Sequence, residues 1–295
     1  MAACHKGEGG GPNTGSREGL RDLIEQNIND DMQTFTANSF SAQQITGNHG
    51  TQVLLQPNAF RHGNGSPVTG AVQLQLLEVL TMADMIRFNK QTVGNDAGVY
   101  RLLRSGGAVY LNATQGGATL RIAPGSVTVR VPAANPDFNM ELFAGRETQE
   151  GLMTWYPIDS SSITFPSDTS NFDPFYTFSV DSLEWINCDY FGSYPNTTVI
   201  TATVPGAQPM DSTAAWIAFP TENAVMNLSA SLTPQTFTSW QDVGVGLDAV
   251  VVALYRDGAQ YYSAFHPITI TSGMNVPLSF TPTTLAQFEA ALAGL

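Results

Sequence analysis

The sequence predicts an all-β protein of tandem β-sandwich modules with short terminal helices. Between about residue 32 and residue 281, short alternating or β-branched runs are separated by Gly, Asn, Asp and Pro, as in sandwich folds. Helical spacing of apolar residues occurs mainly at the two ends. The composition, 42% hydrophobic and 10% aromatic, is sufficient for a core and excludes global disorder.

The net charge of the chain limits which classes of partner it can bind. Charged residues make up 13% of the chain, and 12 basic against 25 acidic residues give a net charge of −13. A chain with so few basic residues cannot neutralise many phosphate groups, so we expect no nucleic acid partner. The sequence has no apolar run of about 18 residues, so we expect no membrane-spanning helix.

Residues 1–16 predict a flexible tether, because the segment is rich in glycine and poor in apolar residues. Met1-Ala2-Ala3-Cys4 resembles the end of a bacterial lipoprotein signal, in which small residues precede a lipidated cysteine. The apolar region that should precede such a cysteine is absent. Either the sequence begins after a trimmed signal and Cys4 carries a lipid, or Cys4 is an ordinary tail cysteine.

The first elements follow from local pattern. Ser16 is a suitable N-cap for a helix over residues 17–30, whose apolar positions share one face. A single helical turn is expected at Ala83–Phe88. The strands expected up to residue 186 are Gln33–Phe40, Thr51–Leu55, Val68–Leu80, Ala108–Thr114, Thr119–Ala123, Ser126–Val131, Met140–Phe143, Leu152–Tyr156, Phe175–Val180 and Leu183–Ile186.

A further strand series begins at Thr197. Its expected strands are Thr197–Val204, Thr213–Phe219, Ala249–Tyr255, Gln260–Phe265, Pro267–Thr271 and Val276–Phe280. The sequence Arg256–Ala259 contains Asp-Gly and predicts a hairpin turn. Thr284 with Gln287 forms a capping box for a closing helix, Thr284–Leu295.

These elements divide the chain into four parts. We predict a tether over residues 1–16, a helix and first β-sandwich domain over 17–145, and a C-terminal β-sandwich domain with a terminal helix over 196–295. Residues 146–195 are too aromatic for a linker, so we expect them to pack as β structure on the first domain.

The search for reactive groups yields no catalytic residue. The four histidines show no zinc-type spacing, and we expect no metal site and no cofactor. Cys188 lies in an apolar, aromatic stretch, which predicts a buried, reduced thiol that is not bonded to Cys4. Asp168 and Asp173 are weak candidates for a calcium loop, although Asx residues also simply form turns.

Aromatic residues offer a second kind of site. Trp155, Tyr156 and Trp185 are candidates for stacking against sugar rings if they are exposed on one face. Residues of this type more often belong to a core or an interface. The sequence leaves both interpretations open.

Several segments resemble uncharacterised cell-envelope lipoproteins of Bacteroidota, and Pro124–Pro132 resembles the sandwich domain shared by ankyrins and netrin receptors. The segments that carry the first resemblance are Ile45–Gly47, Asn58–Phe60, Val68–Val72, Glu78, Asp84–Ile86, Ser105–Gly107, Met140–Gly145 and Leu183–Phe191. The resemblance covers about two-thirds of the chain. It implies a β-sandwich and an envelope location, and it assigns no catalytic residue.

These observations predict a non-enzymatic protein of the bacterial cell envelope, outer membrane or cell surface, lipid-anchored or secreted. We expect it to act through protein–protein contacts in adhesion, scaffolding or assembly, with membrane contact only through the anchor. Gln33–Phe40 is an extended strand that can pair with a partner or a second copy, because lysine-poor edges are poorly guarded. The alternatives are a carbohydrate-binding accessory module and, less favoured, a carboxylate-dependent hydrolase.

Overall fold

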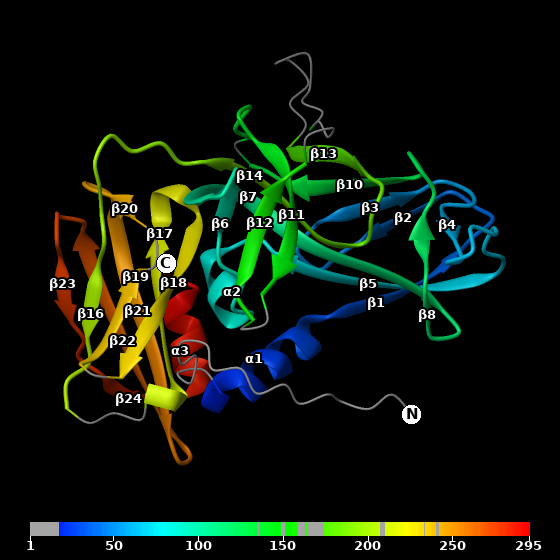
Figure 1. Ribbon diagram of the computed structural model, residues 1–295. Coiled ribbons are helices and arrows are strands. Elements are labelled where there is room, and N and C mark those ends of the chain that lie inside the picture. The colour runs from blue at the N-terminus through cyan, green and yellow to red at the C-terminus, as the bar shows by residue number, and fades with distance from the viewer. Residues whose placement is uncertain are drawn as a thin grey trace.

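Strands make up most of the described chain, which confirms the all-β prediction (Figure 1). The computed structural model describes residues 18–134, 136–148, 151–158, 163, 174–206, 210–232, 234–239 and 242–295. The α-helices in these ranges are α1 (Glu18–Asp31), α2 (Met82–Arg87) and α3 (Leu285–Leu292). They lie where the sequence predicted them, and none of the described helices is long and apolar enough to cross a membrane.

The first module is a sandwich of two sheets. In spatial order, the larger sheet contains β1 (Gln33–Asn38), β5 (Ala71–Val79), β7 (Val99–Gln115), β14 (Glu184–Phe191), β11 (Glu141–Glu147), β12 (Met153–Pro157) and β6 (Val93–Asp96), with β8 (Ala118–Thr119) paired to β7. The smaller sheet contains β13 (Phe175–Val180), β10 (Val127–Pro132), β3 (Gln52–Leu55) and β2 (Gln43–Thr46). Two short strands, β4 (Phe60–Arg61) and β9 (Arg121–Ile122), pair with each other.

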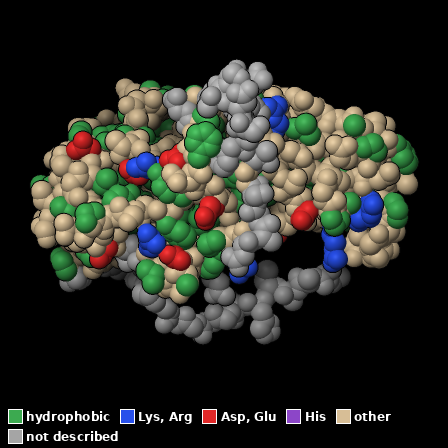
Figure 2. Space-filling view, turned by 90° about the horizontal axis from the view of Figure 1, so that it is seen from above, with side chains coloured by type: hydrophobic (Ala, Val, Ile, Leu, Met, Phe, Trp, Pro, Cys, Tyr) green, Lys and Arg blue, Asp and Glu red, His purple; other side chains and the backbone are tan. Residues whose placement is uncertain are grey.

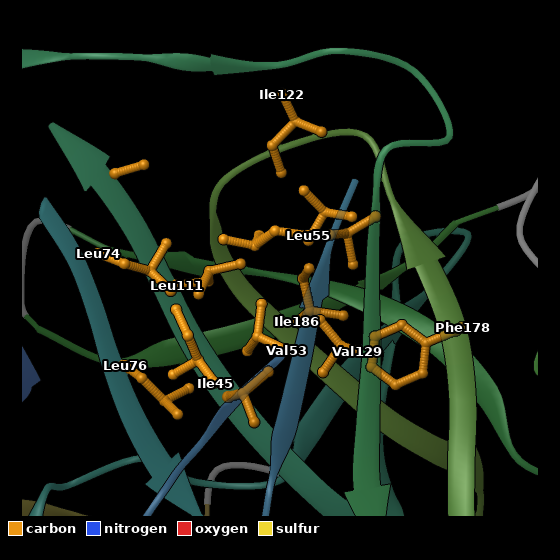
Figure 3. Close-up of a cluster of buried hydrophobic side chains, with 14 of the residues drawn as sticks. Ile45, Val53, Leu55, Leu74, Leu76, Leu111, Ile122, Val129, Phe178 and Ile186 are labelled. Carbon is orange, nitrogen blue, oxygen red and sulfur yellow. The ribbon is translucent and has the colours of Figure 1, made fainter. Parts of the chain in front are cut away.

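Period-two alternation determines which side chains enter this sandwich. Leu76, Leu111 and Ile186 point between the sheets and meet Val53 and Phe178 of the smaller sheet (Figure 3). Their neighbours along the same strands therefore face the opposite side of the larger sheet. The outer face formed in this way carries Trp155 and Trp185, whereas Tyr156, the next residue along β12, lies on the other face.

The predicted middle segment, residues 146–195, contributes β12, β13 and β14 to the sheets of the first module. β14 lies between β7 and β11, and β13 pairs with β10. β6 pairs in parallel with β12 and antiparallel with β7, so part of the larger sheet closes on itself. Pairings of this range cannot be read from local sequence.

The second module is a single sheet that bends around its own core. Its spatial order is β23 (Asn275–Pro277), β16 (Thr201–Thr203), β19 (Gln235–Ser239), β18 (Ala224–Leu232), β17 (Thr213–Phe219), β21 (Asp248–Asp257), β22 (Gln260–Thr269) and β24 (Thr281–Thr283). Beside it, β15 (Thr197–Thr198) pairs with β20 (Val243–Gly244), and the 3₁₀ turns η2 (Met210–Ser212) and η3 (Pro220–Glu222) flank β17.

The prediction of separate strands at Gln260–Phe265 and Pro267–Thr271 was wrong. β22 runs unbroken through His266 and Pro267 to Thr269. Asp257 and Gln260 pair across the hairpin turn, which places Pro267 at a position that does not donate to β21. The proline therefore costs the ladder no hydrogen bond and remains in the strand.

The two modules share buried side chains. A cluster that includes Met85 of α2, Trp155 of β12, Trp216 of β17 and Phe288 of α3 draws on both modules and on the helices. Figure 1 shows α2 and α3 between the two sets of strands. The described modules therefore form one packed unit.

Candidate functional site

The outer edge of β1 is the best exposed pairing surface on the described sheets. β1 ends the larger sheet of the first module and, among the described strands, pairs with β5 alone. The backbone N–H of Ser39 donates to the Gly70 carbonyl at 3.0 Å, which continues the β1–β5 register. By alternation, Phe35 and Ala37 direct their backbone groups to β5, and Thr34 and Thr36 direct theirs outward.

The surface of β1 fits this role. Thr34, Thr36 and Asn38 are exposed, and Phe40 just beyond the strand is 60% exposed. The strand has no charged residue and no proline. One outward donor is already occupied, because the Asn38 N–H donates to Gln43 Oε1 at 3.1 Å. We call the outward side of Thr34–Thr36 the β1 edge.

Other described edges are less open. Pro277 lies in β23, Pro282 lies in β24, and Pro267 lies in the part of β22 that extends beyond β24. Proline removes a donor and hinders pairing with another strand. β13 lacks proline, but Phe175 and Thr177 at its alternate positions are half-buried. β2 also lacks proline, and it is only four residues long.

The structure separates the three candidate aromatic residues. Trp155 is 1% exposed, and its indole N–H donates to the Gln91 carbonyl at 2.7 Å. The expectation that Trp155 could stack on a sugar is therefore wrong, because β12 directs this side chain into the core shared by the modules. Tyr156, the next residue along β12, is half-buried beneath the Arg146 guanidinium, 4.9 Å from its ring centroid.

Trp185 of β14 is half-buried and lines an open pocket between α1 and the larger sheet. Glu25 and Glu147 line the same pocket, so two carboxylates and an aromatic side chain share one cavity. The Glu147 carboxylate is paired with the Lys90 ammonium. This pairing commits one of the two acids to a salt bridge, which disfavours catalysis by a pair of carboxylates. The hydrolase alternative stays a prediction.

Cys188 is a free, fully buried thiol, as predicted. Burial raises its pKa well above the ordinary value, and the neighbouring Asp189 acts in the same direction. A thiol that remains protonated and inaccessible cannot serve as a nucleophile at neutral pH. Cys188 therefore packs in the core of the first module.

Asp189 is also fully buried, at a bulge where the β14–β7 register shifts. Its carboxyl accepts a hydrogen bond from the Asn187 amide at 2.5 Å. Burial raises the pKa of Asp189 well above its ordinary range, although hydrogen bonds from the Ser105 hydroxyl and the Gly106 backbone act in the opposite direction. Burial therefore favours the protonated form of Asp189 in the folded protein.

The described histidines make structural contacts. The backbone N–H of His49 donates to the Glu78 carboxylate at 2.9 Å, and the backbone N–H of His62 donates to the Ser66 carbonyl at 2.9 Å. His266 Nε2 accepts a hydrogen bond from the Ser279 N–H at 2.9 Å. Within the described ranges, no group of three His, Cys, Asp or Glu side chains is placed to hold a metal.

Three of the candidate site residues predicted from the sequence lie outside the described ranges. They are Cys4, the predicted lipidation site, and Asp168 and Asp173, the weak calcium candidates. The lipid anchor and the calcium loop therefore stay predictions.

Sequence reasoning missed the charged contacts between distant elements. Arg104 of β7 makes a bidentate ion pair with Glu222 of η3, whose side chain is 4% exposed. Lys90 follows α2 and pairs with Glu147 at the end of β11. Neither pair has a sequence signal, because its members lie 118 and 57 residues apart.

Comparison with known proteins adds no assignment. No family model matches this chain, and no curated protein matches it. The likeness to envelope lipoproteins and to ankyrin-type sandwich domains stays a prediction.

Proposed function

We propose that the protein is a non-enzymatic protein of the cell envelope or surface that acts by pairing strands with a partner chain through the β1 edge. The observation that carries this proposal is the outward placement of the Thr34 and Thr36 backbone groups on an exposed, uncharged strand. Main-chain hydrogen bonds along an open edge are a common mode of protein recognition.

A second copy of the chain is the simplest partner. Antiparallel pairing centred on Phe35 places Thr34 of one copy opposite Thr36 of the other, so the edge is complementary to itself. Threonine pairs of this kind stabilise adjacent strands. The net charge of −13 opposes association, and salt screens such repulsion. Association should therefore strengthen as the salt concentration rises.

Thr34→Lys tests the edge directly. An outward lysine guards an edge strand against pairing, so the variant should remain monomeric under conditions in which the natural chain associates. The measurement is sedimentation velocity at micromolar concentration in moderate salt. Thr34 is exposed, so the variant should fold normally.

Ser272→Lys is the matched control, because it adds the same charge at an exposed loop residue of the second module. Both variants make the chain less negative, and nonspecific association would strengthen equally in both. The proposal requires association to be lost in Thr34→Lys and retained in Ser272→Lys. A monomeric natural chain at every salt concentration would contradict it.

The envelope location has a separate test. If Cys4 is lipidated, mass spectrometry of the protein from its native cells will find an acylated N-terminal peptide. An unmodified Cys4 would remove the lipid anchor and leave the β1 edge proposal unaffected.

A further inference from the structure

The outer face of the larger sheet of the first module carries a pocket that is independent of the β1 edge. Tyr110 and Trp185 lie opposite each other on β7 and β14, with their side chains on the face that points away from the sandwich core. α1 lies over this face, and the space between helix and sheet has a volume of about 570 Å³. Small-molecule sites usually fall in this size range. We call this space the Trp185 pocket.

The aromatic floor is fixed in position. The Tyr110 and Trp185 rings lie 5.3 Å apart, and the edge of Trp155 packs on Trp185 at 6.4 Å. A Cβ atom at Gly145 would lie 2.6 Å from the Trp155 ring and 2.7 Å from the Trp185 Cβ. Gly145 therefore allows the two tryptophans to pack together, so that the buried one supports the one that lines the pocket.

The polar groups of the pocket carry no net charge. Arg21 and Lys90 are balanced by Glu25 and Glu147. The Lys90 ammonium pairs with Glu147 and lies over the Trp185 ring, 5.1 Å from its centroid, so one face of the indole already carries a cation. This balance favours a neutral ligand that offers both donors and acceptors, because an ion of either sign would meet a like charge.

The remaining wall of the Trp185 pocket is apolar and mostly aliphatic. Ile24, Ile28 and Met32 reach the pocket from α1 and its C-terminal end, and Phe88 joins them from the end of α2. An aromatic floor, paired charges and an apolar wall together match a sugar ring that carries an apolar substituent. The ring would stack on the floor, its hydroxyls would reach the charged groups, and the substituent would contact the wall.

We propose that the Trp185 pocket is a binding site for a neutral sugar bearing an acetamido group, in which Trp185 supplies the stacking surface. Of the three aromatic candidates from the sequence, this assigns sugar binding to Trp185 alone. Tyr156 is not among the residues that line the pocket.

Calorimetric titration of the full chain with N,N′-diacetylchitobiose (chitobiose below), cellobiose and a sulfated disaccharide tests this proposal. We expect chitobiose to bind more tightly than cellobiose, because cellobiose lacks the methyl groups that reach the aliphatic wall. Trp185→Ala should weaken chitobiose binding by about tenfold or more. Tyr156→Ala, a change of a half-buried aromatic residue on a nearby strand, should leave binding unchanged.

A second variant guards against misfolding of Trp185→Ala. Arg21 and Glu25 are exposed on α1, so the double change Arg21→Ala with Glu25→Ala should fold normally and still weaken chitobiose binding. Absence of binding by all three sugars at about 10 mM, a range far above typical site affinities, would overturn the proposal. Tighter binding of the sulfated sugar than of chitobiose would also overturn it. So would chitobiose affinities that are the same for the natural chain, Trp185→Ala and the double variant of Arg21 and Glu25.

Discussion

Buried acidic side chains in this protein serve two different structural purposes. Glu78 is 2% exposed, and its carboxylate accepts hydrogen bonds at 2.9 Å from the Gln33 side chain and from the His49 and Thr51 N–H groups. These contacts fix the loop between β2 and β3 against β5. Asp189, by contrast, lies at a bulge of β14, where burial raises its pKa.

Glu78→Gln should destabilise the fold by about 1.5–3 kcal/mol, because hydrogen bonds to a charged acceptor contribute about this much and one buried donor loses its partner. Urea unfolding monitored by circular dichroism measures the change. Glu141→Gln is the control, because Glu141 is exposed on β11. A shift of about 0.5 kcal/mol or less for Glu78→Gln, as for an ordinary surface change, would contradict this role.

Asp189→Asn should change how stability depends on pH. The pKa of Asp189 is raised in the folded state, so its contribution is fully present below the unfolded pKa and is lost as pH rises toward the folded pKa. The amide cannot ionise. The variant should therefore gain stability relative to the natural chain as the pH rises above about 4, the unfolded pKa of an aspartate. Urea unfolding at a series of such pH values is the check, and a stability difference independent of pH would count against a neutral Asp189.

At the scale of elements, the capping box predicted at Thr284 is confirmed, whereas the predicted N-cap Ser16 lies outside the described residues. Thr284 accepts from the Gln287 N–H at 3.2 Å, and the Gln287 side chain accepts from the Thr284 N–H at 2.9 Å, as the capping box predicts. Thr81 and Asp84 form the same arrangement at α2. Local signals of this kind are readable because both partners lie within one turn.

Thr284→Ala should cost about 1 kcal/mol, since it removes the side-chain acceptor at the N-cap of α3. Thermal or urea unfolding gives the value, with Thr271→Ala in an exposed loop as control. Because Phe288 and Leu292 of α3 enter the shared core, the loss should affect the global transition. Fraying of α3 alone, without a shift of the main transition, would argue against this coupling.

Many strand positions were predicted, but β18 and β19 were missed, and the predicted strand Thr197–Val204 is two strands, β15 and β16, in different sheets. The partners of the strands were not predictable. The runs around Leu74, Val129 and Val251 alternate or are continuously apolar, and each is a strand. The closure of β6 onto β12 pairs Trp155 with Gly94, and the indole N–H of Trp155 bonds to Gln91, 64 positions away. The packing of Trp155 against Trp185 also joins distant residues of the chain. Local sequence specifies which side chains are apolar, and it does not specify which of two aromatic residues is covered.

The same limit applies to the candidate sites. The sequence of β1 predicted an unguarded strand, since it lacks lysine and proline. Only the register with β5 shows that Thr34 and Thr36 turn their backbone groups outward. Trp185 was recognisable as a candidate, but Lys90, Glu25 and Ile28 join it from α1 and the end of α2. The spacing of these residues in the sequence does not indicate that they line one pocket.

At the scale of the whole molecule, the two described β-modules pack together into one unit. Residues 89–92 connect α2 to β6 and bond to β17 and β18 of the second module. Thr92 donates to the Val225 carbonyl at 2.8 Å, and the Asn227 N–H donates to Gln91 Oε1 at 3.1 Å. Trp216 donates to Asn89 Oδ1 at 3.2 Å, which extends the contact into the shared core.

Differential scanning calorimetry of the natural chain and of Trp216→Ala tests whether the two modules unfold together. Removing a buried tryptophan from a shared core should cost about 3–5 kcal/mol. We expect a single unfolding transition for the natural chain, with equal calorimetric and van't Hoff enthalpies. In Trp216→Ala, the whole transition should shift to a lower temperature. Two separate transitions, with Trp216→Ala moving only one of them, would contradict this expectation.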